Sequence, residues 1–247
     1  MESKYCYENG TLINNKEIHD YEKFKIEEQR FSLERISLLR LIKEKIDSDN
    51  YESAVSMIIS AFNLKDKSEE ERMVIVKWVI GIFNSVFSTK TYLNIHRFIF
   101  SDFYPFAGEI RDEAIYKENT PYFQNKTSFC YPSFIYSALN RILSDMSLNA
   151  FRVKNKEILC KYIGKYYGEL NMVHPFREGN GRTLRLYIEL LIDYFNQYLE
   201  RQVYIDYTKL DKEELRKATI ISSVTGDYSY IEEIFNSIII EKSRKRI

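Results

Sequence analysis

Apolar residues recur at helical spacing along most of the chain. Between residues 17 and 47 they fall mostly three, four or seven positions apart, at Phe24, Phe31, Leu33, Ile36, Leu39, Ile42 and Ile46. Side chains at this spacing share one face of an α-helix, so the pattern predicts a helix with a charged outer face. The same periodicity predicts helices over residues 54–62, 69–87 and 91–100, the first two joined by a charged turn at residues 65–67.

One stretch, residues 110–129, breaks this periodicity. Pro105 ends the preceding helical pattern, and Asn-Thr-Pro at 119–121 and Gln-Asn-Lys at 124–126 are turn signals. We expect a β-hairpin here, at the only good place for one in the chain. Helical spacing resumes over residues 132–148, 156–172, 183–199, 211–221 and 229–240, and the chain before residue 17 is expected to be extended, with a turn at Asn9-Gly10.

Three single residues inside these predicted helices have a structural interpretation. Gly164 and Gly168 are four positions apart, so both lack a side chain on the same helix face, although each costs about 1 kcal/mol of helix propensity. We therefore expect another element to approach closely there. His96 lies alone in the helix predicted over residues 91–100, and we interpret it as a buried structural histidine.

The composition narrows the class of protein. The 247 residues include 36 Lys+Arg, 36 Asp+Glu, 15% aromatic residues, 8 Gly and 4 Pro. This length fits one or two globular domains, and the scarcity of Gly and Pro favours a mostly helical fold. Balanced charge argues against a large DNA-binding surface, because that surface would be strongly basic.

Cysteine usage and hydropathy indicate a cytoplasmic protein without a membrane partner. Cys6, Cys130 and Cys160 are odd in number and show neither CxxC spacing nor a neighbouring histidine cluster, so no disulfide framework or structural zinc site is predicted. The most apolar run, residues 73–87, contains Lys77 and Asn84 and is too short to span a bilayer. No secretory signal is recognisable at the start of the chain.

The chemistry is concentrated in residues 174–185, His-Pro-Phe-Arg-Glu-Gly-Asn-Gly-Arg-Thr-Leu-Arg. Pro175 disfavours helical geometry at His174, so we expect a helix to end there with the imidazole at its end. The Gly-Asn-Gly at 179–181 can adopt positive φ values that let backbone N–H groups converge on an anion. A helix starting near Arg182 would add its free N–H groups and its dipole, which favours a bound phosphate.

The charged side chains of this segment extend the same interpretation. Arg182 and Arg185 are three residues apart, so they share a helix face and could clamp further phosphate oxygens of a polyphosphate. Glu178 would be repelled by phosphate unless a cation lay between them, which predicts a Mg²⁺ ligand. His174, with an ordinary pKa of about 6.5, could take a proton from an incoming hydroxyl. Together these residues predict nucleotidyl or phosphoryl transfer.

Each part of the segment has an ordinary structural explanation when taken alone. Gly-Asn-Gly is a common turn, paired arginines often form a solvated helix face, and histidine before proline can simply end a helix. Eight specified positions in twelve residues, however, arise by chance on the order of once in 10^10 placements. The combination therefore favours the functional interpretation.

At these positions the chain resembles the Fic (Fido-fold) family, whose signature is His-x-Phe-x-Asp/Glu-Gly-Asn-Gly-Arg-x-x-Arg. Every fixed position matches from His174 to Arg185. Residues 95–100 and 104–111 are similar to the family's upstream helix and the entry to its flap hairpin, and residues 7–39 are similar to N-terminal arms of bacterial members. The resemblance covers about residues 90–240 and implies a mostly α Fic/Fido helical fold with a small β-hairpin flap.

The resemblance implies an organisation in three parts. Residues 1–88 would form an N-terminal helical arm with an inserted helical pair, residues 89–241 the Fic domain, and residues 242–247 a basic tail. The implied activity is protein adenylylation, in which AMP passes from ATP to a Tyr, Ser or Thr hydroxyl of a target protein and pyrophosphate is released.

The resemblance also implies a role for each site residue. His174 is the general base and Glu178 holds Mg²⁺. The phosphates of ATP are bound by Gly179, Asn180, Gly181, Arg182 and Arg185. Lys117 and Glu118 are similar to a flap stretch near the nucleotide, and the target protein would add as a strand to the flap hairpin near residues 117–123, up to Phe123.

Regulation is the point at which the chain departs from many members. Their inhibitory helix carries Ser/Thr-x-x-x-Glu-Gly/Asn, whose glutamate pairs with the second motif arginine, here Arg185. Residues 48–53, 229–234 and 237–242 each miss the last position. Three interpretations follow: a toxin restrained by a separate small antitoxin, which we favour, a chain ending before its inhibitory helix, or an unregulated effector delivered into another cell.

Two other functions compete with adenylylation. A Fic-type enzyme could use another nucleotide or transfer the terminal phosphate, although the relatives that transfer that phosphate replace the second glycine and arginine pattern that is intact here. Alternatively, the nucleotide site could serve only to dock a partner, without turnover.

Overall fold

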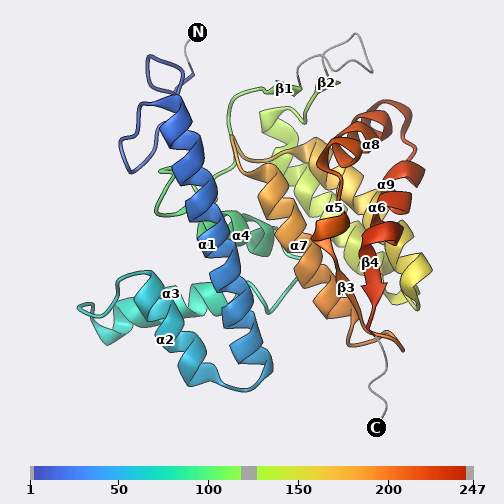
Figure 1. The fold of residues 1–247 in the computed structure, drawn as a ribbon, viewed down its shortest axis with the longest axis horizontal. Helices are drawn as coiled ribbons and strands as arrows, with labels where there is room; N and C mark the ends of the chain where they lie inside the picture. The colour runs from blue at the N-terminus through green and yellow to red at the C-terminus, as the bar shows by residue number, and fades with distance from the viewer. Residues whose placement is uncertain (1–2, 118–126, 243–247) are drawn as a thin grey trace. The chain divides into compact units, whose positions relative to one another are not determined.

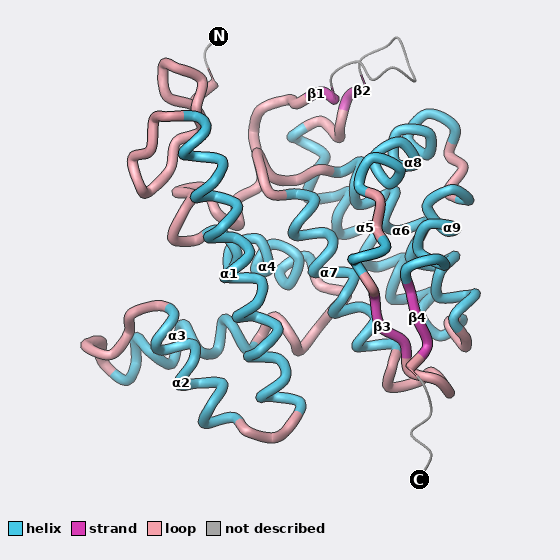
Figure 2. The backbone as a smooth tube through the Cα atoms, in the orientation of Figure 1, coloured by secondary structure: helices cyan, strands magenta, loops and turns pink. Residues whose placement is uncertain are grey.

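The computed structural model describes residues 3–117 and 127–242, and most of them are helical, as predicted (Figure 1). The chain divides into two compact units, Met1–Ser85 with Lys90–Glu109, and Val86–Thr89 with Ile110–Ile247. The strands are confined to short pairs (Figure 2). Among the described residues, none of the helices combines the length and apolar character that crossing a bilayer requires. The organisation in three parts that the sequence predicts, residues 1–88, 89–241 and 242–247, stays a prediction.

The first unit opens with an extended segment and continues with helices. Gly10 adopts a φ of 82° in the predicted turn, and its N–H donates to the Tyr7 carbonyl over 2.9 Å. The helices are α1 (Tyr21–Asp47), α2 (Tyr51–Ala61), α3 (Glu69–Ile80) and α4 (Thr89–Phe100). The Asp20 side chain caps α1, and a reciprocal Ser68–Glu71 capping box starts α3.

The prediction that the third helix extends to residue 87 is wrong. It ends at Ile80, and residues 81–84 form turns. Glycine at position 81 and the polar Asn84-Ser85 lower helix propensity in a run whose apolar character alone suggested a helix.

Aromatic contacts explain how α2 and α3 are held in this unit. Phe62, which follows α2, lies edge-on to Trp78 of α3 and to Phe98 of α4, with ring centroids 5.5 and 5.7 Å apart. The buried Arg35 guanidinium of α1 lies 4.6 Å from the Phe62 ring centroid and pairs with Asp102. Helices α2 and α3 are therefore packed into this unit's core.

His96 has the structural role predicted for it. Its side chain is fully buried, and its Nδ1 accepts a hydrogen bond of 2.8 Å from the Gly108 N–H.

The second unit contains the predicted hairpin and the remaining helices. Strands β1 (Tyr116–Lys117) and β2 (Thr127–Ser128) are antiparallel, with Tyr116 opposite Ser128. The helices are α5 (Ile135–Asn149), α6 (Lys156–Val173), α7 (Asn180–Phe195), α8 (Lys212–Thr225) and α9 (Ser229–Ile238), with short 3₁₀ segments at Pro132–Phe134, Ala150–Arg152 and Tyr207–Lys209. The predicted helices match these elements, with ends that differ by a few residues.

A second strand pair was not predicted. Strand β3 (Val203–Ile205) pairs antiparallel with β4 (Ile239–Glu241), which follows α9 directly and replaces the last residues of the helix predicted to residue 240. The β-branched run at residues 238–240 favours a strand once a partner is present. Asn196 holds that partner, because its side chain accepts from the Val203 N–H and donates to the Val203 carbonyl.

Helix α6 lies at the centre of this unit, packed against α5, α7, α8 and α9. The close approach predicted at its two glycines is confirmed. A Cβ atom at Gly164 would lie 3.0 Å from the Glu232 backbone nitrogen, and one at Gly168 would lie 2.7 Å from the Tyr228 ring. Helix α9 and the residue before it therefore occupy the space that both missing side chains leave.

Gly168→Ala should destabilise the fold despite improving helix propensity. The added methyl would lie 2.7 Å from ring carbons of Tyr228, so that the ring must shift, an overpacking cost of about 1–3 kcal/mol that we expect to exceed the gain of about 1 kcal/mol from replacing glycine. Urea unfolding should report a lower free energy of unfolding. Lys161→Ala, at an exposed position of the same helix, is the control, and a Gly168→Ala protein as stable as this control would contradict the packing.

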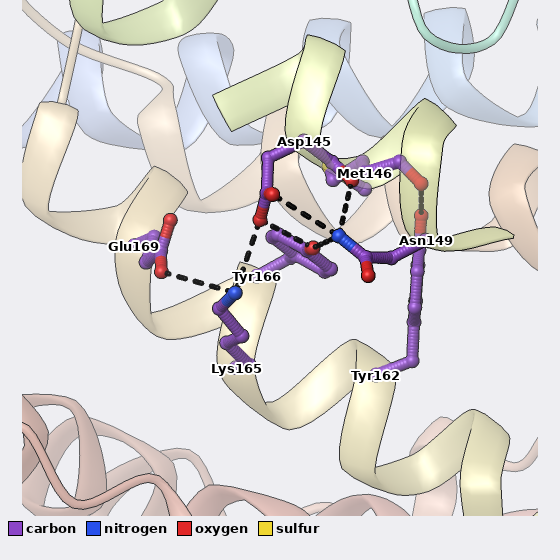
Figure 3. Close-up of polar contacts among 7 residues, drawn as sticks. All are labelled: Asp145, Met146, Asn149, Tyr162, Lys165, Tyr166 and Glu169. Atoms are coloured by element: carbon purple, nitrogen blue, oxygen red, sulfur yellow. Dashed lines mark hydrogen bonds and ion pairs between the residues drawn. The ribbon is translucent and has the colours of Figure 1, made fainter. Parts of the chain in front are cut away.

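A polar cluster joins α5 to α6 at the edge of this core (Figure 3). Asp145 accepts hydrogen bonds from the Tyr166 hydroxyl at 2.7 Å and from Lys165 at 3.0 Å, and Asn149 donates to both Asp145 and Tyr166. Nearby, the Tyr162 hydroxyl donates to the Met146 carbonyl at 2.6 Å. The hydrogen bond from Tyr166, followed by that from Lys165, lowers the pKa of Asp145 below its ordinary 3.8.

Asp145→Asn should therefore lower stability in a pH-dependent way. Because the pKa of Asp145 is lower in the folded than in the unfolded state, its contribution is complete above about pH 4–5 and is lost as the pH falls through the folded-state pKa. The side chain is 41% exposed, so solvent screening limits the loss at neutral pH to about 1 kcal/mol. Urea unfolding from pH 7 to pH 3 should show the two proteins converging, and a constant difference would contradict this cause.

Candidate functional site

The predicted helix end at residue 174 is confirmed. Helix α6 stops at Val173, and His174 adopts the left-handed conformation, with φ 46° and ψ 61°, while its N–H donates to the Leu170 carbonyl. Left-handed geometry at a residue other than glycine costs about 1–3 kcal/mol, so the surrounding contacts must hold it in place.

Two neighbours fix the His174 imidazole. The Phe129 ring stacks on it, with centroids 3.9 Å apart and planes inclined by 21°. Nδ1 lies 3.2 Å from the Asn171 carbonyl oxygen. Since a carbonyl can only accept, this contact is a hydrogen bond when Nδ1 carries the proton, which leaves the imidazole lone pair on Nε2. A neutral His174 is therefore arranged to accept a proton at Nε2.

The loop between His174 and the next helix is closed by Asn180. Asn180 is buried, with 7% exposure. Its side chain accepts a hydrogen bond from the Phe176 N–H at 2.9 Å and donates one to the Phe176 carbonyl at 2.7 Å. Its amide is thus used within the protein. Any contribution of Asn180 to anion binding must come from its main chain, a distinction that the sequence does not make.

The glycines flanking Asn180 differ from the prediction. Helix α7 begins at Asn180 and not near Arg182, and only Gly179 takes a positive φ, of 78°. Gly181 is already helical. A Cβ atom there would lie 3.3 Å from Nη1 of Arg185, so its small size makes room for that guanidinium. Converging N–H groups come from the first helical turn and not from two left-handed glycines.

Glu178 occupies the helix N-terminus in this structure. Its Oε1 accepts from the Gly179 N–H at 2.8 Å and lies 3.5 Å from Nη2 of Arg182. A carboxylate is stabilised there by the helix dipole. Phosphate would compete for the same place, so its arrival requires the carboxylate to turn away or a cation to lie between the two groups.

Arg185 lies beside a buried tyrosine of α6. Burial raises the pKa of Tyr167, and its contact with the Arg185 guanidinium partly opposes that rise. The Tyr207 hydroxyl donates to the Arg185 carbonyl at 3.0 Å. These contacts hold the second motif arginine on the same turn as Arg182, which is one-fifth exposed.

The predicted flap residues, the basic tail and the metal site are described only in part. Lys117 lies in β1, where its main chain pairs with Thr127. Glu118 and the rest of the predicted docking segment, through Phe123, lie outside the described residues, as does most of the predicted basic tail. Among the residues that the structure describes, no group of three or more His, Cys, Asp or Glu could form a metal cage.

Sequence reasoning missed two contributors, Phe129 and Asn171, because their contacts with His174 depend on tertiary packing. A usable signal for Asn171 was its place three residues before His174 on the predicted helix. Phe129 gave no local signal, because it follows β2 and is brought to His174 only by folding.

Residues 86–192 match the model of the Fic/DOC family. Among curated proteins, the chain is 32% identical over 138 residues to a probable protein adenylyltransferase of Sinorhizobium fredii, which covers 55% of this chain and 65% of that protein. It is 34% identical over 128 residues to a protein adenylyltransferase of Bartonella schoenbuchensis, covering 52% and 24%. The chain thus matches less than two thirds of the length of either relative.

Solved structures share the fold over nearly the whole chain. The N-terminal Fic domain of a VirB-translocated effector from Bartonella quintana, with bound ADP, superposes with a TM-score of 0.70 at 18% identity and covers 97% of this chain and 96% of its own. The BepC effector of Bartonella tribocorum, with bound AMPPNP, gives 0.67 at 17% identity and covers 98% and 99%. Identities this low establish the fold alone.

Proposed function

We propose that this chain, whose residues 86–192 match the Fic/DOC family model, is a protein adenylyltransferase that moves AMP from ATP to a Tyr, Ser or Thr hydroxyl of a target protein. One observation carries the proposal. An imidazole oriented to accept a proton at Nε2 stands one loop away from a helix N-terminus that bears Arg182 and Arg185. That arrangement suits in-line attack on a bound polyphosphate.

The reaction then assigns a step to each group. The target hydroxyl gives its proton to Nε2 of His174 while its oxygen bonds to the α-phosphorus of ATP. The bond between the α-phosphorus and the bridging oxygen breaks, and pyrophosphate leaves with that electron pair. The Asn171 carbonyl accepts from Nδ1–H and stabilises the imidazolium formed.

The helix N-terminus supplies the electrostatic part. Main-chain N–H groups of Asn180 and Gly181 in the first turn of α7 face the α-phosphate, where charge develops on the non-bridging oxygens. Arg182 and Arg185 hold the outer phosphates and the departing pyrophosphate. Their place on one face of one turn supports binding of a nucleoside triphosphate over a single phosphate.

Mg²⁺ fits this site as a partner of the substrate. Glu178 is the carboxylate beside the first turn of α7, and one carboxylate with phosphate oxygens and water is a common Mg²⁺ arrangement. The ion would neutralise phosphate charge and allow the carboxylate and the nucleotide to occupy adjacent positions.

The target is proposed to dock on the β1–β2 hairpin as an added strand, near Lys117. A two-stranded sheet has an edge that can pair with another chain, and Phe129, next to β2, stacks on His174. A strand added there would carry its hydroxyl toward the base.

We also propose that a separate small antitoxin controls this site. Without the antitoxin, the protein would act as a cytoplasmic toxin or as an effector delivered into another cell. Two of the incomplete inhibitory segments, residues 229–234 and 237–242, have glutamates with other surroundings. Glu241 pairs with Arg201 at 2.9 Å, and Glu233 is exposed on α9. A partner's glutamate could therefore serve Arg185. Coexpression with the protein encoded next to this one should abolish labelling if that protein is the antitoxin, and unchanged labelling would reject it.

Labelled ATP tests the proposed reaction. Incubation of the protein with a cell lysate should label protein bands from α-phosphate-labelled ATP but not from γ-labelled ATP, because AMP is retained and pyrophosphate is lost. Labelling from the γ-position alone would establish phosphoryl transfer in its place. Nucleotide binding without label in any band over many turnover times would support the docking interpretation.

A further inference from the structure

Arg111 is among the largest fully buried side chains of the protein, with 1% exposure. Its guanidinium donates three hydrogen bonds to main-chain carbonyls: from Nε to His174 at 2.8 Å, from Nη1 to Glu113 at 2.6 Å, and from Nη2 to Cys130 at 2.6 Å. One side chain thus ties its own segment, at Glu113, to two segments farther along the chain, at Cys130 and His174. The planar fork of guanidinium donors suits this arrangement, and these bonds help to offset the cost of burying its charge.

The main chain of Arg111 acts on the same loop. Its N–H donates to the Pro175 carbonyl at 2.9 Å, while its side chain holds the carbonyl of His174. Two successive carbonyls of the loop are therefore fixed by one residue. Because His174 is held in a left-handed conformation that residues with a side chain rarely adopt, these bonds keep its backbone in place.

The other two bonds reach both arms of the hairpin. Glu113 precedes β1, and Cys130 follows β2, next to Phe129, whose ring stacks on His174. The Cys130 N–H also donates to the Met172 carbonyl near the end of α6. The Arg111 guanidinium therefore joins the entry and exit of the hairpin to the loop that carries the imidazole.

We propose that Arg111 is a positioning residue, which sets the His174 imidazole relative to the hairpin that presents the target hydroxyl. This inference rests on the proposed function of the site. Arg111 acts through His174, since the three guanidinium hydrogen bonds described above go to carbonyls of the loop and hairpin, whereas the phosphate-binding turn begins at Gly179. Its loss should lower the rate of transfer and leave nucleotide affinity intact.

Arg111→Lys is the sharpest variant, because it keeps the charge but replaces the fork with a single ammonium that cannot reach three carbonyls in a plane. Arg216→Lys, at a half-exposed side chain of α8, is the matched control. The chain has only three histidines, so the side-chain ¹H–¹⁵N NMR signals of His19, His96 and His174 can be followed separately, with His174→Ala giving the assignment.

In Arg111→Lys the His174 signal should shift while those of His19 and His96 stay in place. The transfer rate at saturating ATP should fall by about 10²-fold, the effect of misplacing a catalytic group by roughly 1 Å, with the Kd for ATP unchanged. Arg216→Lys should alter none of these. An unmoved His174 signal in folded Arg111→Lys, or an ATP affinity that weakens in step with the rate, would overturn the proposal.

Wild-type protein supplies a second test should Arg111→Lys fail to fold. The Arg111 Nε–H signal should exchange slowly with solvent because it is buried and bonded to the His174 carbonyl. Fast exchange would reject the positioning role. If wild-type protein transfers no AMP, adenylylation fails, while the His174 signal and the Arg111 exchange rate still decide the positioning role.

Discussion

His174→Ala is expected to slow AMP transfer by about 10²–10⁴-fold, the usual contribution of a general base, while ATP binding is retained. The reason is geometric. The Asn171 carbonyl directs the Nδ1 proton inward and Phe129 holds the ring plane, so Nε2 is the atom prepared to receive the proton. Phosphate binding depends on the first turn of α7 and should survive the substitution.

Transfer of label from α-phosphate-labelled ATP measures the rate, and calorimetry measures the Kd for ATP. His19→Ala is the matched control, because His19 is exposed and belongs to the other compact unit. Equal labelling by His174→Ala and His19→Ala would remove the general base from the mechanism. Loss of ATP binding in His174→Ala would instead assign the imidazole to the nucleotide site.

Local signals in the sequence predicted much of this site. Pro175 marks the end of a helix because it acts on the residue before it, and the spacing of Arg182 and Arg185 places both on one face. The tight packing at Gly164 and Gly168 was also predictable, since two missing side chains at helical spacing leave a groove. In each case the physical cause lies within a few residues of the feature.

What could not be predicted depends on partners far along the chain. Strands β3 and β4 are separated by more than thirty residues, and the isoleucines at 238–240 fit a helix as well as a strand until β3 places Ile205 opposite Ile239 and Tyr204 opposite Ile240. The stacking of Phe129 on His174 likewise joins two residues that are far apart in the chain. Non-local pairing therefore set the limit of the sequence analysis.

Glu178 makes contacts in the structure that its charge alone did not predict. Charge repulsion from phosphate predicted a cation beside it, and in the structure the carboxylate accepts a hydrogen bond from the Gly179 N–H and approaches Arg182. The side chain thus fills the anion position that the substrate needs. Under the proposed function, a bound nucleotide must displace this carboxylate or share a cation with it, and these two outcomes distinguish a structural cap from a metal ligand.

Glu178→Gln is expected to change affinity and rate in opposite directions. Without metal, ATP should bind about fivefold more tightly, because removing a negative charge beside the helix N-terminus relieves repulsion of about 1 kcal/mol. With Mg²⁺, transfer should fall by about 10²-fold, since the amide is a poor metal ligand. Glu213→Gln, at an exposed carboxylate of α8, should alter neither quantity.

Calorimetric titration of ATP with EDTA and with Mg²⁺ separates the two effects. A purely structural cap would give the reverse affinity change, because the glutamine amide oxygen accepts from the Gly179 N–H more weakly than a carboxylate does, which would loosen the turn that binds phosphate. Weaker metal-free binding by Glu178→Gln would therefore exclude the metal-ligand role. Tighter metal-free binding together with lost Mg²⁺ dependence is the result that only a carboxylate lying between helix dipole, metal and phosphate can produce.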